Sequence, residues 1–384
     1  MTTISPGIDF QHLRFREFPL AAECAFLNHA GSSPLPARSA QALAAYAARA
    51  QRKHLRYKAN AEDYDCGPLR RLVAATINAD PSEVTFVPST CDGVAIAANA
   101  IDWRPGDNVV LPECEYPGVV YPWLNLARRG VEARLVPAPL GHVDMDALCA
   151  AIDSRTRAVS ISHVQWASGY LVDVGRLGQI CRSRGILLVV DAIQSLGATP
   201  VDVQQMQADV LVAGCYKWLM GIPGAAVFYV RRDAMPALVP DRAGQESVCT
   251  SLMDRPALVW KEDAMRYQVG GDCTAAQVVL ERSLGLLVEA GVERIHAHVV
   301  ALLDRLTAGL RRLGFTVTSS LRLQTRSTIL SFTTGDLERD EALRAHLLQR
   351  DVITALRPYG IRVSPHLYNA PEDIDALIEA LQAA

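Results

Sequence analysis

The chain has 384 residues, more than a single hydrophobic core usually holds, so we expect one large and one smaller domain. Hydrophobic residues make up 50% of the chain, and a net charge of −3 gives no electrostatic reason to expect nucleic acid or an anionic membrane as a partner. Polar residues interrupt every apolar run before it reaches membrane-spanning length, and residues 1–18 lack the apolar segment of a signal peptide. We therefore expect a cytoplasmic protein.

Cysteine and lysine are informative through their positions. The nine cysteines are widely spaced and none forms a C-x-x-C pair, which favours buried thiols in a reducing compartment over a disulfide framework or a metal site. Lysine occurs only at positions 53, 58, 217 and 261. A lysine inside an apolar stretch, as at Lys217, is therefore unusual in this chain and needs a physical reason.

Short apolar runs alternate with amphipathic segments of helical length over roughly residues 60 to 260. The runs are rich in Val and Ile, which is typical of strands buried on both faces of a largely parallel sheet. The expected strands are Val84–Val87, Asn108–Leu111, Ala133–Val136, Ala158–Val164, Ile186–Val190, Asp209–Ala213 and Gly224–Val230. This alternation predicts an α/β domain in which helices cover both faces of the sheet.

The C-terminal part has a different pattern, which predicts a smaller α+β domain. Its expected elements are a helix at Ala276–Leu313 with a break near Gly291, strands at Phe315–Ser319 and Ser327–Phe332, a helix at Leu337–Arg350, a strand at Ile361–Ser364 and a helix from Pro371. We expect residues 1–30 to join this small domain, residues 31–275 to form the large domain and residues 276–384 to form the small one.

Two of the expected strands lead into ionisable residues. One buried strand ends at Asp191, at the carboxyl edge of the sheet, where open α/β folds bind ligands. Another leads into Lys217, which aromatic residues flank and the turn Gly221-Ile-Pro-Gly224 follows. A desolvated lysine has a lowered pKa and becomes nucleophilic toward an aldehyde. The structural alternatives are a helix N-cap for Asp191 and a lysine whose ammonium reaches water for Lys217.

Two further strands lead into possible ligand-binding residues. A Ser/Thr cluster at Ser89 and Thr90 opens an Ala-rich helix, whose free backbone N–H groups suit a phosphate. Tyr116 follows the next strand and could stack on a planar ligand. An ordinary N-cap and an ordinary tyrosine would explain each feature alone. None of these alternatives explains why a phosphate-type turn, an aromatic residue, a buried carboxylate and a lysine follow strands of one parallel sheet.

These residues resemble the class V aminotransferase family of fold-type I enzymes that use pyridoxal 5′-phosphate (PLP), a family that includes cysteine desulfurases, isopenicillin N epimerase-like proteins and kynureninases. The resemblance extends over nearly the whole chain. Its most specific part is the spacing from Val189-Val-Asp191-Ala-Ile-Gln194 to Tyr216-Lys217-Trp218. The other matching segments are Phe26-Leu-Asn28-His29-Ala30-Gly31-Ser-Ser-Pro34-Leu-Pro36 and Arg362-Val-Ser-Pro-His-Leu-Tyr368-Asn369.

The resemblance implies a role for each matching residue. Lys217 would carry PLP as a Schiff base, and Asp191 would keep the ring nitrogen protonated. Gln194 would hydrogen-bond the phenolic oxygen of the ring, and Tyr116 would stack on its face. The other cofactor-binding residues that it implies are Thr90, Cys91, Tyr216 and His163.

The resemblance also implies an amino-acid substrate and a homodimer whose active site lies at the subunit interface. Arg362 would bind the substrate carboxylate, since a guanidinium can form two parallel hydrogen bonds with it. Asn28 and His29 would line the same pocket.

Three departures from the family pattern affect the expected activity. The residues before Lys217 read Gly214-Cys215-Tyr216, closer to the kynureninase-like form than to the desulfurase pattern. No cysteine follows Cys273, and the stretch 351–360 is short, so the persulfide mechanism of desulfurases, which needs a cysteine on a mobile loop, is not expected. Gly271 stands where relatives often have a threonine that reaches the partner's cofactor phosphate, and Thr274 is a candidate replacement.

We therefore expect a PLP-dependent enzyme that deprotonates the Cα of an amino acid and then eliminates a β-substituent, with a C–S bond as a plausible point of cleavage. Epimerisation and transamination are the alternatives within the family. A phosphate-ligand-binding α/β protein without PLP chemistry is the alternative from another class, although the chain has neither a G-x-G-x-x-G nor a P-loop motif in the required context. A family member that has lost catalysis is the third alternative, and the presence of Asp191, Gln194 and Lys217 argues against it.

Overall fold

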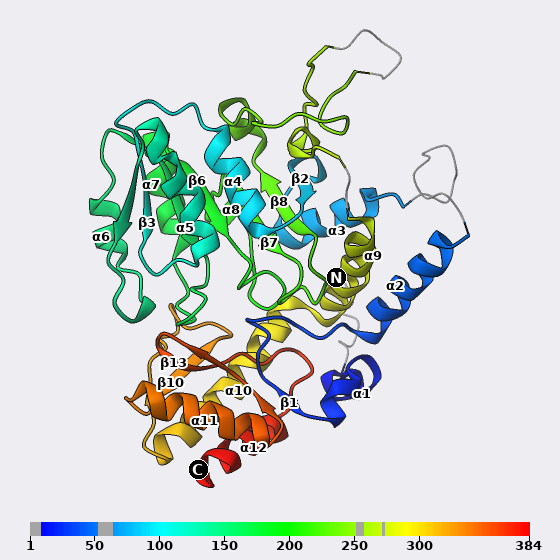
Figure 1. Ribbon diagram of the computed structural model, residues 1–384, viewed down its shortest axis with the longest axis vertical. Coiled ribbons are helices and arrows are strands. Elements are labelled where there is room, and N and C mark those ends of the chain that lie inside the picture. The colour runs from blue at the N-terminus through cyan, green and yellow to red at the C-terminus, as the bar shows by residue number, and fades with distance from the viewer. Residues whose placement is uncertain (1–8, 53–63, 251–256, 271–272) are drawn as a thin grey trace, which may run out of the picture.

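A seven-stranded sheet forms the centre of the computed structural model, which describes residues 9–52, 64–250, 257–270 and 273–384. The strands are β2 (Val84–Val87), β3 (Asn108–Pro112), β4 (Glu132–Val136), β5 (Thr156–Ser162), β6 (Leu187–Asp191), β7 (Val210–Gly214) and β8 (Ala226–Val230). Their order in the sheet is β2-β8-β7-β6-β5-β3-β4 (Figure 1). Each strand begins and ends within two residues of its expected range, and the predicted mostly parallel α/β sheet is confirmed.

One strand runs against the rest of the sheet. β8 pairs antiparallel with both β2 and β7, whereas β3, β4, β5, β6 and β7 pair in parallel. The connection from β7 to β8, residues 215–225, forms turns instead of a crossover helix, so the chain reverses direction there. Lys217 lies in this connection, directly beyond the carboxyl end of β7.

Helices cover both faces of the large sheet. They are α3 (Gly67–Ile77), α4 (Thr90–Ala100), α5 (Pro117–Leu124), α6 (Met145–Ala150), α7 (Val174–Arg184) and α8 (Val203–Met206), whereas α2 (Ala37–Ala50) packs on the later helix α9 (Thr274–Ala290) at the side of the molecule. Short 3-10 helices occur at η1 (Pro19–Ala22), η2 (Pro81–Glu83), η3 (Asn125–Arg129), η4 (Pro139–Gly141), η5 (Arg232–Ala237) and η6 (Ala264–Tyr267).

The sheet separates two hydrophobic cores. Val189 and Val212 pack with α4 and α5 in one core, and their neighbours Val190 and Leu211 pack with α7 in the other. This division follows from the strand geometry, in which successive side chains point to opposite faces. Gly93 lets α4 approach β7 closely, because a Cβ at this position would lie 2.5 Å from Cγ1 of Val212. The close approach brings the first turn of α4 to the carboxyl edge of the sheet.

The chain after α9 (Thr274–Ala290), a helix that packs on α2 and α3, forms a second layer beneath the sheet in Figure 1. Its elements are α10 (Val292–Arg312), β9 (Thr316–Val317), β10 (Leu330–Thr333), α11 (Leu337–Gln349), β11 (Val352–Ile353), β12 (Ala355–Arg357), β13 (Gly360–Val363) and α12 (Pro371–Gln382). A four-stranded antiparallel sheet has the order β12-β13-β10-β9. The expected helix break lies at Gly291, whose φ of 81° falls in the left-handed region that favours glycine.

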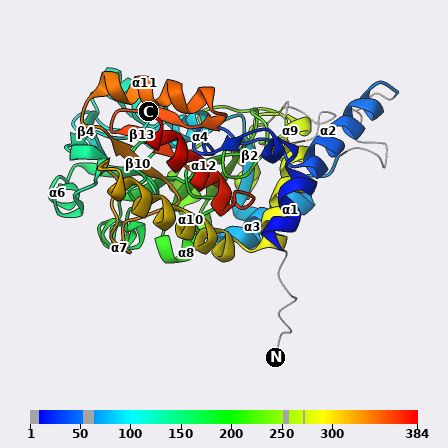
Figure 2. The same cartoon turned by 90° about the horizontal axis from the view of Figure 1, so that it is seen from below.

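The N-terminal segment packs on this C-terminal layer. It contains α1 (Phe10–Glu17) and β1 (Ala25–Phe26), and β1 pairs in parallel with β11. Arg14 and Asp373 of α12 form a buried ion pair, with Nη1 2.6 Å from Oδ2. Figure 2, seen from below, shows α10 and α12 lying across the C-terminal layer near α1. Residues 1–8 of the expected segment lie outside the described residues.

The proposed limit between residues 275 and 276 falls in the first turn of α9, and the domain limits stay a prediction. Within the described ranges, no helix combines the length and the apolar character needed to cross a bilayer.

Candidate active site

The candidate site lies where several strands of the large sheet end at their carboxyl termini. Asp191 is the last residue of β6, and Lys217 follows β7 by three residues. Tyr116 comes after β3 as the N-cap of α5, and Thr90 begins α4 after β2. These side chains are far apart in the sequence, and the parallel arrangement of the strands brings them to one edge of the sheet.

Lys217 is almost completely buried, with 8% of its surface exposed. Burial lowers the pKa of its amine to about 8; the charge of Asp191 opposes this change, and the charges of Arg362 and Arg357 add to it. Its Nζ lies 5.7 Å from the centre of the Tyr116 ring and 5.8 Å from that of Tyr216. The site therefore holds an amine that loses its proton much more readily than a solvated lysine.

Asp191 is the buried carboxylate of the site. Burial raises the pKa of Asp191 to about 6, while a backbone hydrogen bond and the charge of Lys217 act in the opposite direction. Its Oδ1 accepts a hydrogen bond from the backbone N–H of Ile193 at 2.8 Å. A buried carboxylate is stabilised in its charged form by a nearby cation, which a protonated ring nitrogen would supply.

Gln194 has a defined orientation in the wall of the site. Its Oε1 accepts from the indole N–H of Trp218 at 2.9 Å, and its Nε2 donates to the carbonyl oxygen of Ala30 at 3.0 Å. An amide nitrogen carries two hydrogens, and the described contacts use one of them. The other can serve an oxygen atom of a ligand.

The first turn of α4 is tied to the sheet next to Lys217. The Thr90 hydroxyl accepts a hydrogen bond from the backbone N–H of Gly214 at 2.9 Å, and Ser89 caps the helix by accepting from the N–H of Asp92 at 3.1 Å. The first amides of a helix lack intrahelical partners and carry partial positive charge, so they suit a phosphate. Cys91 lies in the same turn, where the charge of Asp191 raises the pKa of its thiol and the charge of Lys217 lowers it.

Arg362 comes from β13 of the small sheet and reaches the same site. It is 1% exposed; its Nη1 donates to the carbonyl oxygen of Trp166 at 2.6 Å, and its Nη2 donates to Oδ1 of Asn28 at 3.2 Å. Its Nε is buried without a hydrogen-bond partner among the described residues. Burial, together with the charge of Arg357, lowers the pKa of Arg362 to about 9. A buried guanidinium that has an N–H group without a partner is expected of a carboxylate-binding site.

Arg357 is a site residue that sequence reasoning missed. It lies on β12, and the β12–β13 pairing places Ala355 opposite Arg362, so Arg357, two residues along β12, is on the same face of the sheet as Arg362. Its guanidinium carbon lies 5.9 Å from the ring centre of Trp166. Within the described residues neither arginine forms an ion pair. The available sequence signal was the pair of arginines on either side of Pro358-Tyr359-Gly360, a hairpin turn.

Glu115 is another site residue that sequence reasoning missed. It supports Tyr116, the residue that precedes α5. Its Oε1 accepts from the N–H of Ser162 at 2.7 Å and from Nε2 of Gln165 at 2.8 Å, and the Ser162 hydroxyl donates to Oε2. Burial raises the pKa of Glu115 to about 7, these hydrogen bonds oppose the rise, and the charge of Asp191 adds to it. Glu115 thus holds the segment that carries Tyr116 against the end of β5.

Two predicted site residues lie apart from this group. Ser162 pairs with Asp191 across β5 and β6, so these side chains share a face, and the next residue, His163, points to the opposite face. His163 lines a separate cavity. His29 is fully buried behind Trp218; its Nδ1 lies 2.7 Å from the Ser33 hydroxyl. We therefore do not include these two histidines among the residues that contact cofactor or substrate.

Similarity to known proteins agrees with this arrangement. The family model described as aminotransferase class-V matches residues 25–377. The chain belongs to this family. It is 28% identical to a probable cysteine desulfurase of Methanothermobacter thermautotrophicus over 96% of both chains, and 29% identical to an uncharacterised aminotransferase of Schizosaccharomyces pombe over 82% of this chain and 80% of the relative.

Solved structures share the fold. A complex of the cystine C-S lyase C-DES with cysteine persulfide superposes with a TM-score of 0.86 at 24% identity, covering 95% of this chain and 99% of that one. The cysteine desulfurase CsdA of Escherichia coli superposes with a TM-score of 0.85 at 21% identity, covering 98% of both chains. The predictions of a fold-type I PLP fold, of an enzyme and of PLP as its cofactor are confirmed.

The residues present fit PLP. Lys217 offers a desolvated amine for the aldehyde, Asp191 a carboxylate for the ring nitrogen, and the first turn of α4 a set of amides for the phosphate. Tyr116 lies close to the Lys217 amine, as a ring that stacks on the cofactor must. The role of each residue toward the cofactor stays a proposal.

Proposed function

We propose that this enzyme is a lyase that eliminates a β-substituent from an α-amino acid, with cleavage of a C–S bond as the favoured case. The observation that carries the proposal is the grouping of Lys217, Asp191 and Arg362 in one buried site. This set combines a base, a carboxylate that stabilises a positively charged ring and a cation that binds a carboxylate. These are the groups that removal of a proton from Cα requires.

Each residue has a defined task in that step. Bound PLP supplies the electron sink for the pair left at Cα. Lys217, with its pKa lowered to about 8, is neutral in an appreciable fraction at physiological pH and can accept the Cα proton. Arg362 holds the substrate carboxylate and so orients Cα toward this amine. The proton held on Nζ of Lys217 can then be donated to the departing sulfur, which leaves with the electrons of the broken Cβ–S bond.

The positions of the cysteines favour elimination over a persulfide mechanism. No cysteine follows Cys273, and the region 351–360 is occupied by β11, β12 and the turn into β13. Cys91, in the first turn of α4, is exposed as a residue, but partial desolvation and the charges of Asp191 and Asp92 raise the pKa of its thiol. A raised pKa disfavours the thiolate, which is the form that would accept sulfur. The name of one structural neighbour, a cystine C-S lyase, is in line with this choice.

Arg357 indicates what the substrate carries beyond its α-carboxylate. Two guanidinium groups in the site leave one positive charge after Arg362 has bound the first carboxylate. Arg357 is half-buried, and a partly desolvated cation gains from an anionic partner. We therefore expect a substrate with a second anionic group, as in cystine or another amino acid with an acidic β-substituent.

The proposal is tested by product analysis. Holoenzyme is incubated with L-cystine, L-cysteine, L-alanine and L-glutamate, and pyruvate, ammonium, keto acids and chirality are followed. Pyruvate and ammonium from cystine without an added keto acid support the lyase. Keto acid formation that depends on a second keto acid would identify an aminotransferase, the name that one relative carries, and loss of chirality without products would identify an epimerase. Either result would replace the proposal.

We also propose a cytoplasmic homodimer whose partner completes the site. Tyr116 is 46% exposed although it lies 5.7 Å from the buried Lys217 amine, so one side of the site is open in the single chain. Gly271, where relatives have a threonine for the partner's cofactor, lies outside the described residues; Thr274 is the first residue of α9. The test mixes Lys217→Ala and Thr274→Val, each of which should be inactive alone if Thr274 serves the partner's cofactor. Activity regained on mixing would support a shared site, and a monomer in light scattering would exclude it.

A further inference from the structure

Trp166 contacts three residues of the candidate active site. Its backbone carbonyl oxygen accepts a hydrogen bond from Nη1 of Arg362 at 2.6 Å. The centre of its indole ring lies 5.9 Å from the guanidinium carbon of Arg357. The same ring meets the ring of Tyr116 edge to face, with the two ring centres 5.5 Å apart. One residue therefore contacts both arginines of the site, Arg362 through its backbone and Arg357 through its ring.

The segment that carries Trp166 is fixed to both sheets. The side-chain amide of the preceding residue donates to Glu115 at 2.8 Å, and the carbonyl oxygen of Ala167 accepts from the hydroxyl of Ser331, on β10, at 2.7 Å. The indole N–H of Trp166 donates to the carbonyl oxygen of Cys114 at 3.1 Å. These hydrogen bonds give the indole ring a defined orientation, as a residue that positions other side chains requires.

The ring of Trp166 restrains the guanidinium group of Arg357. A guanidinium near the face of an aromatic ring is attracted by the ring, most strongly when the ring is tryptophan. Nη1 of Arg357 also donates to the carbonyl oxygen of Leu356 at 2.7 Å. A side chain that is already held in place loses less conformational freedom when it binds a ligand. The contact with Trp166 therefore prepares Arg357 to bind an anion.

The hairpin of the small sheet sets the spacing of the two arginines. Ala355 lies opposite Arg362, so Arg357 is the diagonal neighbour of Arg362 across β12 and β13. Such neighbours are about 7–8 Å apart along the sheet. Because the hairpin fixes the two backbones and Trp166 contacts both side chains, the separation of the two cations is defined. A defined separation of two cations favours ligands whose two anionic groups match it.

We propose that Trp166 is a positioning residue that sets the specificity of the active site. It fixes the separation of the Arg362 and Arg357 guanidinium groups and so selects amino acids that carry a second carboxylate at a matching distance from the first. This inference rests on the proposed function only in assigning the substrate carboxylate to Arg362, and it holds equally for elimination, transamination and epimerisation. Trp166 acts through the arginines, since its own N–H is used by the carbonyl oxygen of Cys114.

The test measures how carboxylates without an amino group bind to the holoenzyme, by isothermal titration at constant ionic strength. Succinate, glutarate and adipate are each compared with the monocarboxylate that has the same number of carbon atoms. In one of the three pairs the dicarboxylate should bind at least about tenfold more tightly. The absence of such a preference in all three pairs would overturn the proposal.

Substitutions of Trp166 should reduce this preference in a graded way. Trp166→Leu removes the aromatic face and should lower the preference about fivefold. Trp166→Phe keeps an aromatic face and should lower it less. Equal preferences in the wild type and Trp166→Leu, or an equal loss in the Leu and Phe variants, would show that the ring does not position Arg357.

A double variant tests whether Trp166 acts through Arg357. Arg357→Gln should abolish the preference for the dicarboxylate. Adding Trp166→Leu to Arg357→Gln should then lower the preference no further, because the two residues act as one unit. A further loss in the double variant would contradict the proposal.

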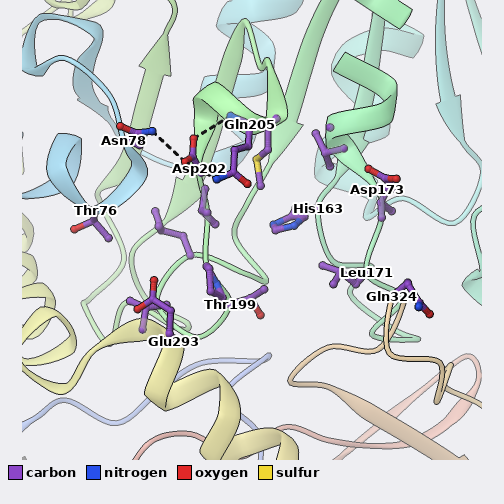
Figure 3. A pocket seen from close by; sticks show the side chains of 18 of the residues that line it. Thr76, Asn78, His163, Leu171, Asp173, Thr199, Asp202, Gln205, Glu293 and Gln324 are labelled. Atoms are coloured by element: carbon purple, nitrogen blue, oxygen red, sulfur yellow. Dashed lines mark hydrogen bonds between the residues drawn. The ribbon is translucent and has the colours of Figure 1, made fainter. Parts of the chain in front are cut away.

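Tyr170→Leu is the matched control. Tyr170 is a half-buried aromatic residue four positions after Trp166, and its ring packs on His142 with ring centres 5.3 Å apart. It lines a second cavity, on the opposite side of the large sheet from Asp191, in which Figure 3 shows His163. The lining of this second cavity includes the carboxylates of Asp173, Asp202 and Glu293. Tyr170→Leu should keep the wild-type preference, and a loss equal to that of Trp166→Leu would overturn the proposal.

The result is separable from that of the lyase proposal, because the titrations need no turnover. If cystine gives no pyruvate while the dicarboxylate preference depends on Trp166, the lyase proposal fails and the role of Trp166 stands. If cystine gives pyruvate and no pair shows a preference, the lyase proposal stands and the role of Trp166 fails.

Discussion

The protonation of Lys217 offers a direct test of the active-site electrostatics. Burial lowers the pKa of Lys217 from the ordinary lysine value of 10.5 to about 8. The difference corresponds to roughly 3 kcal/mol of cost for the charged form. At pH 7 about a tenth of such amines are neutral, which is about 300 times the fraction expected for an ordinary lysine. Lys217 of the PLP-free protein should therefore react with acetic anhydride far more readily than a solvated amine.

The assay is favourable because the chain has only four lysines. Competitive acetylation at a series of pH values, followed by peptide mass spectrometry, resolves Lys217 from Lys261, which serves as the internal reference. The acetylation rate of Lys217 should reach half of its alkaline plateau, the midpoint, near pH 8. Dividing each rate by the plateau rate of the same lysine corrects for the limited accessibility of the buried amine.

Two variants should move this midpoint in opposite directions. Asp191→Asn removes a negative charge that raises the pKa of Lys217, so the midpoint should fall below pH 8 by about one unit, at the low end of the range for a nearby opposite charge. Arg357→Gln removes a positive charge that lowers this pKa, so the midpoint should rise. A wild-type midpoint near pH 10, or shifts of the same sign in both variants, would refute the assignment of these residues to one site.

Three further predictions concern neighbouring residues. Arg362→Lys should lower kcat/KM by about a hundredfold or more, because one ammonium cannot replace the guanidinium bonds to a carboxylate; the control is an unchanged melting temperature, and unchanged kinetics would exclude Arg362 from substrate binding. Burial raises the pKa of Glu115 to about 7 from 4.5, so the folded state holds its proton more tightly than the unfolded chain, and this residue's contribution to stability is lost as pH rises from about 4.5 to about 7. In urea unfolding, the free energy of unfolding should fall across this pH range, and Glu115 should contribute up to roughly 3 kcal/mol of the fall. Glu115→Gln should make the fall smaller. An identical fall in the wild type and in Glu115→Gln would contradict the raised pKa. Cys91→Ser should keep most of the activity with cystine, since the raised pKa of this thiol disfavours a thiolate, whereas a loss of tenfold or more would point to a sulfur-accepting role.

Much of the fold and part of the site could be read from local patterns. The apolar runs predicted the seven strands of the large sheet because burial on both faces demands a continuous stretch of Val and Ile, which is visible in a single segment. Asp191 and Lys217 were identifiable because Asp191 ends such a strand and Lys217 comes three residues after another, and the carboxyl ends of parallel strands lie at one edge of the sheet. The reversed direction of β8 was not predicted, because strand direction depends on how the following connection packs.

The residues that sequence reasoning misplaced depend on faces and on distant partners. His163 stands next to Ser162, but strand geometry turns neighbouring side chains to opposite faces, so a shift of one position separates the PLP site from the second cavity. Arg357 reaches the site only because the β12–β13 hairpin places it on the same face as Arg362. Glu115 acquires its role from Ser162 and Gln165, which lie about fifty residues along the chain, at separations of 47 and 50 positions.

The amino-acid sequence by itself determined which segments become buried strands and which ionisable residues stand at their ends, because these properties follow from side-chain periodicity within a few residues. Only the tertiary structure decided which side chains share a cavity, how far burial and neighbouring charges move their pKa values, and that a second, acidic cavity lies behind the sheet. Those properties are sums over groups distant in the chain, and their energies depend on distances that folding alone establishes.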